Sequence, residues 1–207
     1  MLEIKDATIH VASRHEISAL SFAARDGKMT AVTGRTGSGK TLLLETMLGL
    51  HRLDKGYVTI DGELLEPATA FFFRSRMAYV PQHLYVPGSV TVAEMYDMAR
   101  CGCVPRAAFP SKDDVEAMWQ RLHLDTSLWQ ADMAGLPQGV IKRVLLSLAL
   151  LSRRKMVVAD EPTGHLDDGD AAIVLSLLRA EAARGAVVLV ATKDSRVEQM
   201  ADVCVAL

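Results

Sequence analysis

Residues 34–41 read Gly34-Arg35-Thr36-Gly37-Ser38-Gly39-Lys40-Thr41, and this stretch decides the fold. It completes the pattern G-x-x-x-x-G-K-T, which is the sequence of a phosphate-binding loop. The preceding residues, Met29 to Thr33, are apolar and β-branched and predict a buried strand. The following residues, Leu42 to Leu50, predict an apolar helix. Because a phosphate loop requires a strand before it and a helix after it, the stretch predicts a nucleotide-binding α/β protein.

The residue types in this loop suit a triphosphate and its magnesium ion. The glycines allow backbone N–H groups to approach phosphate oxygens without a clash from Cβ atoms. The N-terminus of the following helix adds partial positive charge at the same point. Lys40 can reach the β- and γ-phosphates, and the hydroxyl of Thr41 can bind Mg²⁺. We therefore expect all eight residues to bind the phosphates of a nucleotide, with Thr41 also serving as a metal ligand.

The overall composition favours a globular protein without a nucleic-acid function. The chain has 207 residues, of which 50% are hydrophobic, and its formal net charge is −2. No block of lysine and arginine is present, so nucleic acid is not expected as a partner. Residues Met1 to Asp6 do not resemble a signal peptide, and the most apolar run, Val140 to Leu151, is too short to span a bilayer. We therefore expect a cytoplasmic protein.

Strands and helices alternate at both ends of the sequence, and helices alone are predicted between them. Strands are predicted at residues 2–5, 17–22, 29–33, 57–60, 77–80, 155–160, 187–191 and 203–207. Helices are predicted at residues 42–50, 92–99, 112–122, 140–152 and 170–183. This order indicates an α/β fold with the parallel-sheet core of a P-loop NTPase, an N-terminal antiparallel β layer and an inserted α-helical subdomain. We expect residues 1–87 and 153–207 to form the core and residues 88–152 to form the helical subdomain.

A pair of acids follows the strand predicted at residues 155–160. Asp160 is a hard oxygen ligand suited to Mg²⁺, and Glu161 could orient and polarise an attacking water molecule. The alternative is a pair of acids that face solvent at the end of a strand. Ligands of parallel α/β sheets bind at the carboxyl ends of the strands. Because the phosphate loop, Gln82, Asp160 and Lys193 all follow strands in this way, the sequence predicts one shared site for them.

The order of these motifs resembles the nucleotide-binding domain of ABC transporters over essentially the whole chain. The resemblance rests on the phosphate loop, on Tyr79-Val80-Pro81-Gln82, and on the run from Ala159 to Asp167 after a helical segment. It implies that Gln82 contacts Mg²⁺ and senses a membrane partner, and that Leu166 and Asp167 lie at a dimer interface. It also implies that two cassettes hold two ATP molecules between them, each bound by the phosphate loop of one subunit and the signature loop of the other.

The signature loop departs from the family pattern Leu-Ser-Gly-Gly-Gln. The matching residues are Leu136-Pro137-Gln138-Gly139-Val140. Pro137 offers neither the hydroxyl nor the N–H group of the usual residues, and Gln138 does not have the backbone freedom of glycine. The start of the helix remains plausible, since proline is tolerated in a first turn. Gln138 and Gly139 remain the residues expected to contact the ATP of the partner subunit.

Two further positions differ from the family. Lys193 stands where the family has a switch histidine; it could contact the γ-phosphate or could be an ordinary surface lysine. Val11 stands where the family has an aromatic residue that stacks on adenine, and His10 or His15 could stack instead.

Three functions are compatible with these motifs. The first is an ATPase subunit that docks on separate integral-membrane permease subunits, at the cytoplasmic face of the inner or plasma membrane. The second is a degenerate cassette that binds ATP, hydrolyses it poorly and acts as a regulatory half. The third is a cassette of DNA repair or translation, against which the absence of a long coiled coil and of basic patches argues. The sequence leaves open whether the cassette forms a homodimer or a heterodimer.

Overall fold

A five-stranded parallel sheet forms the centre of the molecule, in the order β6-β7-β8-β3-β9. The computed structural model describes residues 1–12, 15–83, 89–101 and 109–207, and for residues 11, 12 and 15 it describes the backbone alone. The strands of this sheet are β3 (Met29–Thr33), β6 (Met77–Val80), β7 (Met156–Asp160), β8 (Val187–Thr192) and β9 (Val203–Ala206). All residues of β7 and β8 are buried, as expected for a parallel sheet covered on both faces.

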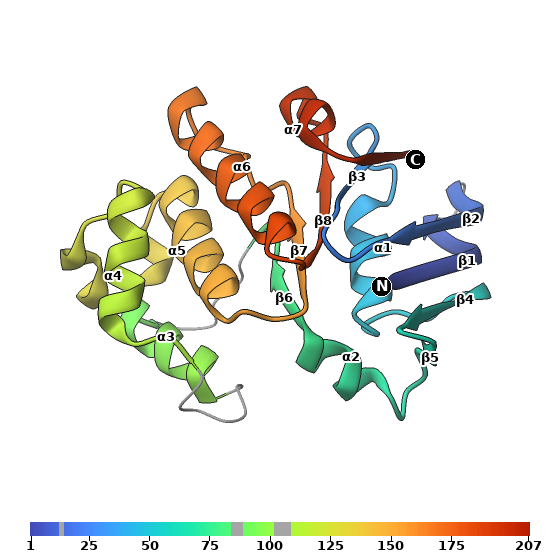
Figure 1. Ribbon diagram of the computed structural model, residues 1–207, viewed down its shortest axis with the longest axis horizontal. Coiled ribbons are helices and arrows are strands. Elements are labelled where there is room, and N and C mark those ends of the chain that lie inside the picture. The colour runs from blue at the N-terminus through green and yellow to red at the C-terminus, as the bar shows by residue number, and fades with distance from the viewer. Residues whose placement is uncertain (13–14, 84–88, 102–108) are drawn as a thin grey trace.

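A second, antiparallel sheet has the order β2-β1-β4-β5. Its strands are β1 (Leu2–Ala12), β2 (His15–Ala24), β4 (Lys55–Ile60) and β5 (Glu63–Leu64). Asp61 and Gly62 join β4 to β5, with φ angles of 52° and 87° that suit a two-residue hairpin turn. Figure 1 shows this sheet on one side of the molecule, with helix α1 (Lys40–Met47) between it and the parallel sheet.

The two faces of the parallel sheet contribute to two hydrophobic clusters. One cluster joins the sheet to α1 and to the antiparallel strands. The other joins the opposite face to α6 (Asp168–Ala183) and to the helices that follow β6. The short helix α2 (Ala70–Arg76) precedes β6, and α7 (Ser195–Met200) lies between β8 and β9. None of the helices in the described ranges has the length and apolar character needed to cross a bilayer.

Helices alone fill the segment between β6 and β7, apart from one bridge between Thr91 and Asp132 within its described part. We call α3 (Val92–Cys101), α4 (Lys112–Arg121) and α5 (Gln138–Leu151) the helical insert, together with the 3-10 helices η2 (Thr126–Gln130) and η3 (Met133–Gly135). Figure 1 shows it on the side of the parallel sheet opposite the antiparallel sheet. Two aromatic rings mark its interior: Trp119 and Trp129 stack 4.5 Å apart, and the indole N–H of Trp119 donates to Ser147 of α5 over 3.0 Å.

The fold class predicted from the sequence is confirmed, and two strands, residues 29–33 and 77–80, begin and end where the sequence predicts. Helices α2 and α7 and strand β5 were not predicted. In α2 only Ala70 and Phe73 are buried, so its short sequence carries little helical periodicity. Strand β1 runs past the predicted residues 2–5 because shifts in register on both sides of Ala7 interrupt the simple alternation of apolar residues.

Candidate functional site

The phosphate loop curls tightly between β3 and α1. Gly37 and Gly39 have φ angles of 83° and 95°, in the region that favours glycine. A Cβ atom on Gly34 would lie 2.6 Å from Oγ of Ser38 and 2.9 Å from the carbonyl oxygen of Leu207. A larger residue at position 34 would therefore force the loop open. The glycines of the motif are required by the shape of the loop itself.

Lys40 lies inside this curl. Only 7% of its surface is exposed, and its Nζ donates to the carbonyl oxygens of Gly34 and Arg35 over 2.8 Å and 3.0 Å. An ammonium group held at the mouth of the loop, beside the first turn of α1, suits an anionic ligand. The sequence predicted this residue as a phosphate ligand, and the structure places its ammonium group against the carbonyl oxygens of the loop; the phosphate contact stays a prediction.

Asp160 meets the phosphate loop through Thr41, as the sequence predicted. The hydroxyl of Thr41 donates to Oδ2 of Asp160 over 2.5 Å. Asp160 is only 1% exposed, and its Oδ1 is a buried oxygen without a hydrogen-bond partner among the described residues. Burial raises the pKa of Asp160, and Glu161 adds to the rise; the Thr41 hydroxyl and the ammonium groups of Lys142 and Lys40 oppose it.

Glu161 has a left-handed backbone, with φ of 47°, and is nearly buried. Its N–H donates to the carbonyl oxygen of Ala191, so the peptide is held at the end of β8. Its Oε2 accepts from the hydroxyl of Thr192 over 3.2 Å and from the backbone N–H of Lys193 over 3.4 Å. The acid therefore points along the carboxyl edge of the sheet and does not face open solvent.

Two predicted residues occupy the same edge with looser attachments. Gln82 follows β6, whose neighbour in the sheet is β7, and it is half-buried in a bend. Lys193 follows β8 and approaches Glu161 through its backbone N–H, while its side chain is exposed. The end of β8 is held instead by Asp194, which accepts from Thr163 and pairs with Arg196. The Arg196 guanidinium lowers the pKa of Asp194 to about 2, against the opposing effect of burial.

The predicted signature residues have different environments. Gln138 is exposed at the first position of α5, and Pro137 is exposed just before it. Gly139 is buried, and a Cβ atom there would lie 2.6 Å from the carbonyl oxygen of His165. Gly139 thus packs against the segment after the acid pair in its own chain, and Gln138 is the member of the pair that another molecule can reach.

The side chain of Val11, the predicted adenine contact, is not among the described ones. Val11 lies in β1, but its side chain and that of His15 fall outside the described part of the structure. His10 is described, and its Nδ1 lies 2.8 Å from Oδ2 of Asp54.

One residue of the site was missed. Lys142 of α5 is 4% exposed, and its Nζ donates to the carbonyl oxygen of Glu161 over 2.6 Å and to that of Asp160 over 3.4 Å. Burial lowers the pKa of Lys142, while the neighbouring Asp160 and Glu161 oppose that shift. The available signal was a lysine within the apolar run from Val140 to Leu151.

The chain is similar to known proteins over most of its length. A model of the ABC transporter family matches residues 17–164. The manganese transport system ATP-binding protein of Listeria innocua is 27% identical over 198 residues, which cover 93% of this chain and 80% of that protein. The molybdenum import ATP-binding protein of Rhizobium etli is 32% identical over 184 residues, which cover 83% of this chain and 49% of that protein.

A solved structure shares the fold. It is a dimeric ATP-binding cassette in a post-hydrolysis state, bound to ADP and Pi. It matches with a TM-score of 0.85 at 20% identity, over 100% of this chain and 94% of the other. These comparisons give no support to the alternative of a degenerate cassette. Since the family model spans well over half of the sequence, the chain belongs to the ABC transporter family, as one of the ATP-binding and ATP-hydrolysing cassettes that energise transport.

Proposed function

We propose that the chain binds ATP with Mg²⁺ at the edge formed by β3, β7 and β8. In this proposal the phosphate loop, residues 34–41, surrounds the phosphates through its backbone N–H groups, and Lys40 contacts the β- and γ-phosphates. The observation that carries the proposal is the bond of 2.5 Å between Thr41 and Asp160, since it brings the loop and the acid pair into one site.

The oxygens beside this bond fit a magnesium ion. Asp160 offers a buried Oδ1 without a hydrogen-bond partner among the described residues, and Thr41 offers its hydroxyl. Both are hard oxygen ligands, which Mg²⁺ prefers. We propose Thr41 and Asp160 as its ligands, with Gln82 as a further one from the end of β6. When bound, the ion neutralises negative charge on the phosphates.

Glu161 is the proposed base. It would accept a hydrogen bond from the attacking water and orient that water toward the γ-phosphate. The hydroxyl of Thr192 and the N–H of Lys193 limit the orientations of its carboxylate. Lys193 would contribute an exposed ammonium group near the γ-phosphate, and Val11 would lie beside the adenine.

A second cassette would complete the site. We propose that the start of α5, with Gln138 and Gly139, faces the ATP of a partner cassette, which is either a second copy or a different chain. Exposure of Pro137 and Gln138 supports this proposal, because an interface residue must be accessible in the single subunit.

The membrane partner is proposed from the relatives, whose names describe ATP-binding proteins of transport systems. We propose that this chain docks on integral-membrane permease subunits at the cytoplasmic face of the membrane. Residues 1–87 and 153–207 would act as the catalytic core, and residues 88–152 as the subdomain that carries the signature region.

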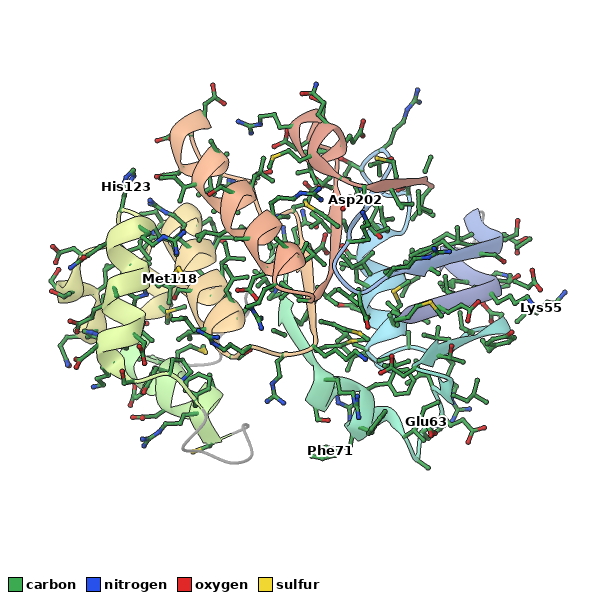
Figure 2. The ribbon with its side chains drawn as sticks, in the orientation of Figure 1. Lys55, Glu63, Phe71, Met118, His123 and Asp202 are labelled. Atoms are coloured by element: carbon green, nitrogen blue, oxygen red, sulfur yellow. The ribbon has the colours of Figure 1, made fainter. Side chains whose placement is uncertain are left out.

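Phosphate release by the purified chain, with Mg²⁺ and after its removal by a chelator, tests the catalytic proposal. We expect Glu161→Gln to lower turnover about 100-fold, the range typical for loss of a general base. ATP affinity should remain within about twofold, since the phosphate loop is intact. Glu63→Gln is the matched control, because Glu63 is exposed on the β4–β5 hairpin, away from the phosphate loop (Figure 2). Full turnover in Glu161→Gln, or turnover that is unchanged after the chelator removes Mg²⁺, would disprove the proposal.

The oligomeric state tests the partner cassette. If the chain pairs with itself, Glu161→Gln should elute as a dimer with ATP and as a monomer without it, because bound ATP is then retained between the subunits. A monomer under both conditions would exclude the homodimer and leave a different cassette as the partner.

A further inference from the structure

Lys142 connects the helical insert to the acid pair. It lies in the first half of α5, one turn after Gln138, and its ammonium group is almost fully buried. The hydrogen bonds of this group go to backbone carbonyl oxygens, 2.6 Å to Glu161 and 3.4 Å to Asp160. An ion buried in this way is stable only with strong partners, and these carbonyls are its partners.

The peptide that Lys142 contacts has an unusual conformation. The φ of 47° at Glu161 is costly for a residue with a side chain and persists only when its surroundings impose it. The carbonyl oxygen of Glu161 accepts from two donors, Nζ of Lys142 and the N–H of Gly164 over 3.0 Å. A Cβ on Gly164 would lie 3.2 Å from that oxygen, so the turn is closely packed. Lys142 thus braces the backbone from which the Glu161 carboxylate projects.

We propose that Lys142 is a positioning residue for Glu161: its ammonium group holds the Asp160–Glu161 backbone so that the carboxylate stays directed toward the attacking water. The inference rests on the proposed role of Glu161 as the base. Packing of α5 alone does not require a lysine here, since its neighbours Ile141 and Val144 are buried in the hydrophobic core as hydrocarbon side chains.

The start of α5 touches the segment after β7 at two points. One is the bond from Lys142 to Glu161, and the other is the close approach of Gly139 to the carbonyl oxygen of His165. Gln138 and Lys142 are four residues apart, about one turn of the same helix. A displacement of the signature residues would move Lys142 with the helix. It would therefore act on the Glu161 peptide through the buried hydrogen bond between Lys142 and Glu161. Lys142 makes the orientation of Glu161 depend on the position of α5.

The test compares Lys142→Met with Lys112→Met. Lys112 lies on α4 of the same helical insert, exposed over the ring of Trp129, and is remote from the acid pair. We expect Lys142→Met to lower kcat about tenfold with ATP affinity unchanged within about twofold, because the hydrogen bonds of Lys142 within the described residues go to Asp160 and Glu161 and not to the phosphate loop. Lys112→Met should keep both values. Unchanged kcat in Lys142→Met, or an equal loss of kcat and of affinity, would overturn the inference.

A double-mutant cycle with Glu161→Gln separates positioning from general damage. If Lys142 acts through Glu161, Lys142→Met should add less than a twofold loss in the Glu161→Gln background, measured in single-turnover reactions. A further tenfold loss would mean that the two residues act independently, and the inference would be wrong. If Glu161→Gln itself has full turnover, the proposed base is refuted. If only Lys142→Met has full turnover, the base stands and the positioning role falls.

Lys142→Gln guards against a variant that does not fold. It keeps a shorter hydrogen-bond donor and fills most of the same space. We expect a kcat between that of the parent chain and that of Lys142→Met. In the Glu161→Gln background, Lys142→Gln should again add less than a twofold loss. If Lys142→Met is insoluble, Lys142→Gln tests the inference in its place. An unchanged kcat in Lys142→Gln, or losses that add in full to those of Glu161→Gln, would overturn the inference.

Discussion

The phosphate loop and the start of α5 are the two segments proposed to contact phosphate, yet they are built differently. The phosphate loop closes on itself: Lys40 bonds to Gly34 and Arg35 of the same loop. The start of α5 is held on its inner side, where Gly139 packs on His165 and Lys142 bonds to Glu161, while Gln138 is exposed. The first segment is shaped by contacts within itself. The second is supported by its own chain on one side, and its exposed side is where we propose that another molecule binds.

The largest effect should come from the closed loop. We expect Lys40→Ala to weaken ATP binding about 100-fold or more, since it removes charge-assisted bonds to phosphate that contribute about 1.5–3 kcal/mol each. Equilibrium binding of a fluorescent ATP analogue measures the change. Lys55→Ala is the control, because Lys55 is the first residue of β4, at the end of the antiparallel sheet that lies farthest from the parallel sheet (Figure 2). Unchanged affinity in Lys40→Ala would remove the phosphate-loop assignment.

The inner side of α5 should be nearly as sensitive, but in stability. Gly139→Ala places a methyl group 2.6 Å from the backbone oxygen of His165, so the helix or the turn must move. We expect a loss of about 2 kcal/mol in the free energy of unfolding, as for other overpacked sites. Gly135→Ala is the matched control in the same insert, since nothing lies within 4 Å of its added methyl group. Equal urea midpoints for the two variants would contradict this packing.

The outer side of α5 should respond in turnover. Replacing Pro137, Gln138 and Val140 by Ser, Gly and Gln restores donors for the γ-phosphate of the partner, and we expect turnover to rise about tenfold. Val140 also packs on the hydrophobic core, so its replacement could weaken packing. A second variant, with Pro137 and Gln138 replaced and Val140 kept, separates the gain in turnover from that loss of packing. If neither variant is faster than the parent, the signature residues do not limit turnover, and the limit lies at Lys193 or in the partner chain.

The smallest effect concerns the ion pair that holds the end of β8. Because Arg196 lowers the pKa of Asp194 to about 2, ionised Asp194 stabilises the fold above pH 4, and this stability is lost as the pH falls from about 4 toward 2. In Arg196→Met the pKa should return toward its ordinary value. The drop in urea midpoint between pH 5 and pH 3 should then be smaller than in the parent. Arg184→Met, which breaks a surface pair with Glu181, should keep the drop of the parent.

The sequence predicted those parts of the fold that depend on local pattern. The apolar runs from Met29 to Thr33 and from Met77 to Val80 are strands because their residues are buried on both sides. The phosphate loop, Gln82, Asp160 and Lys193 were predicted to share the carboxyl edge because each follows a strand of a parallel sheet. Helix α2 was missed because few of its residues are buried, and the length of β1 was missed because of the irregular register around Ala7.

The site was predicted less completely, for a physical reason. Thr41 and Asp160 belong to motifs, and their meeting follows from the topology. The bond from Lys142 to Glu161 joins residues 19 positions apart through the packing of α5 on the sheet, which no local pattern encodes. Lys193 illustrates the same limit, since its backbone N–H and not its ammonium group lies against Glu161.

The stacked tryptophans of the helical insert also provide an intrinsic fluorescence signal. The protein has two tryptophans, Trp119 and Trp129, and both belong to this insert. Intrinsic tryptophan emission therefore originates in the insert alone, although circular dichroism averages over the whole chain. When tryptophan is excited at the indole band, its emission reports whether the helices of the insert melt or shift, while the phosphate loop and both sheets contribute no signal. No label has to be attached.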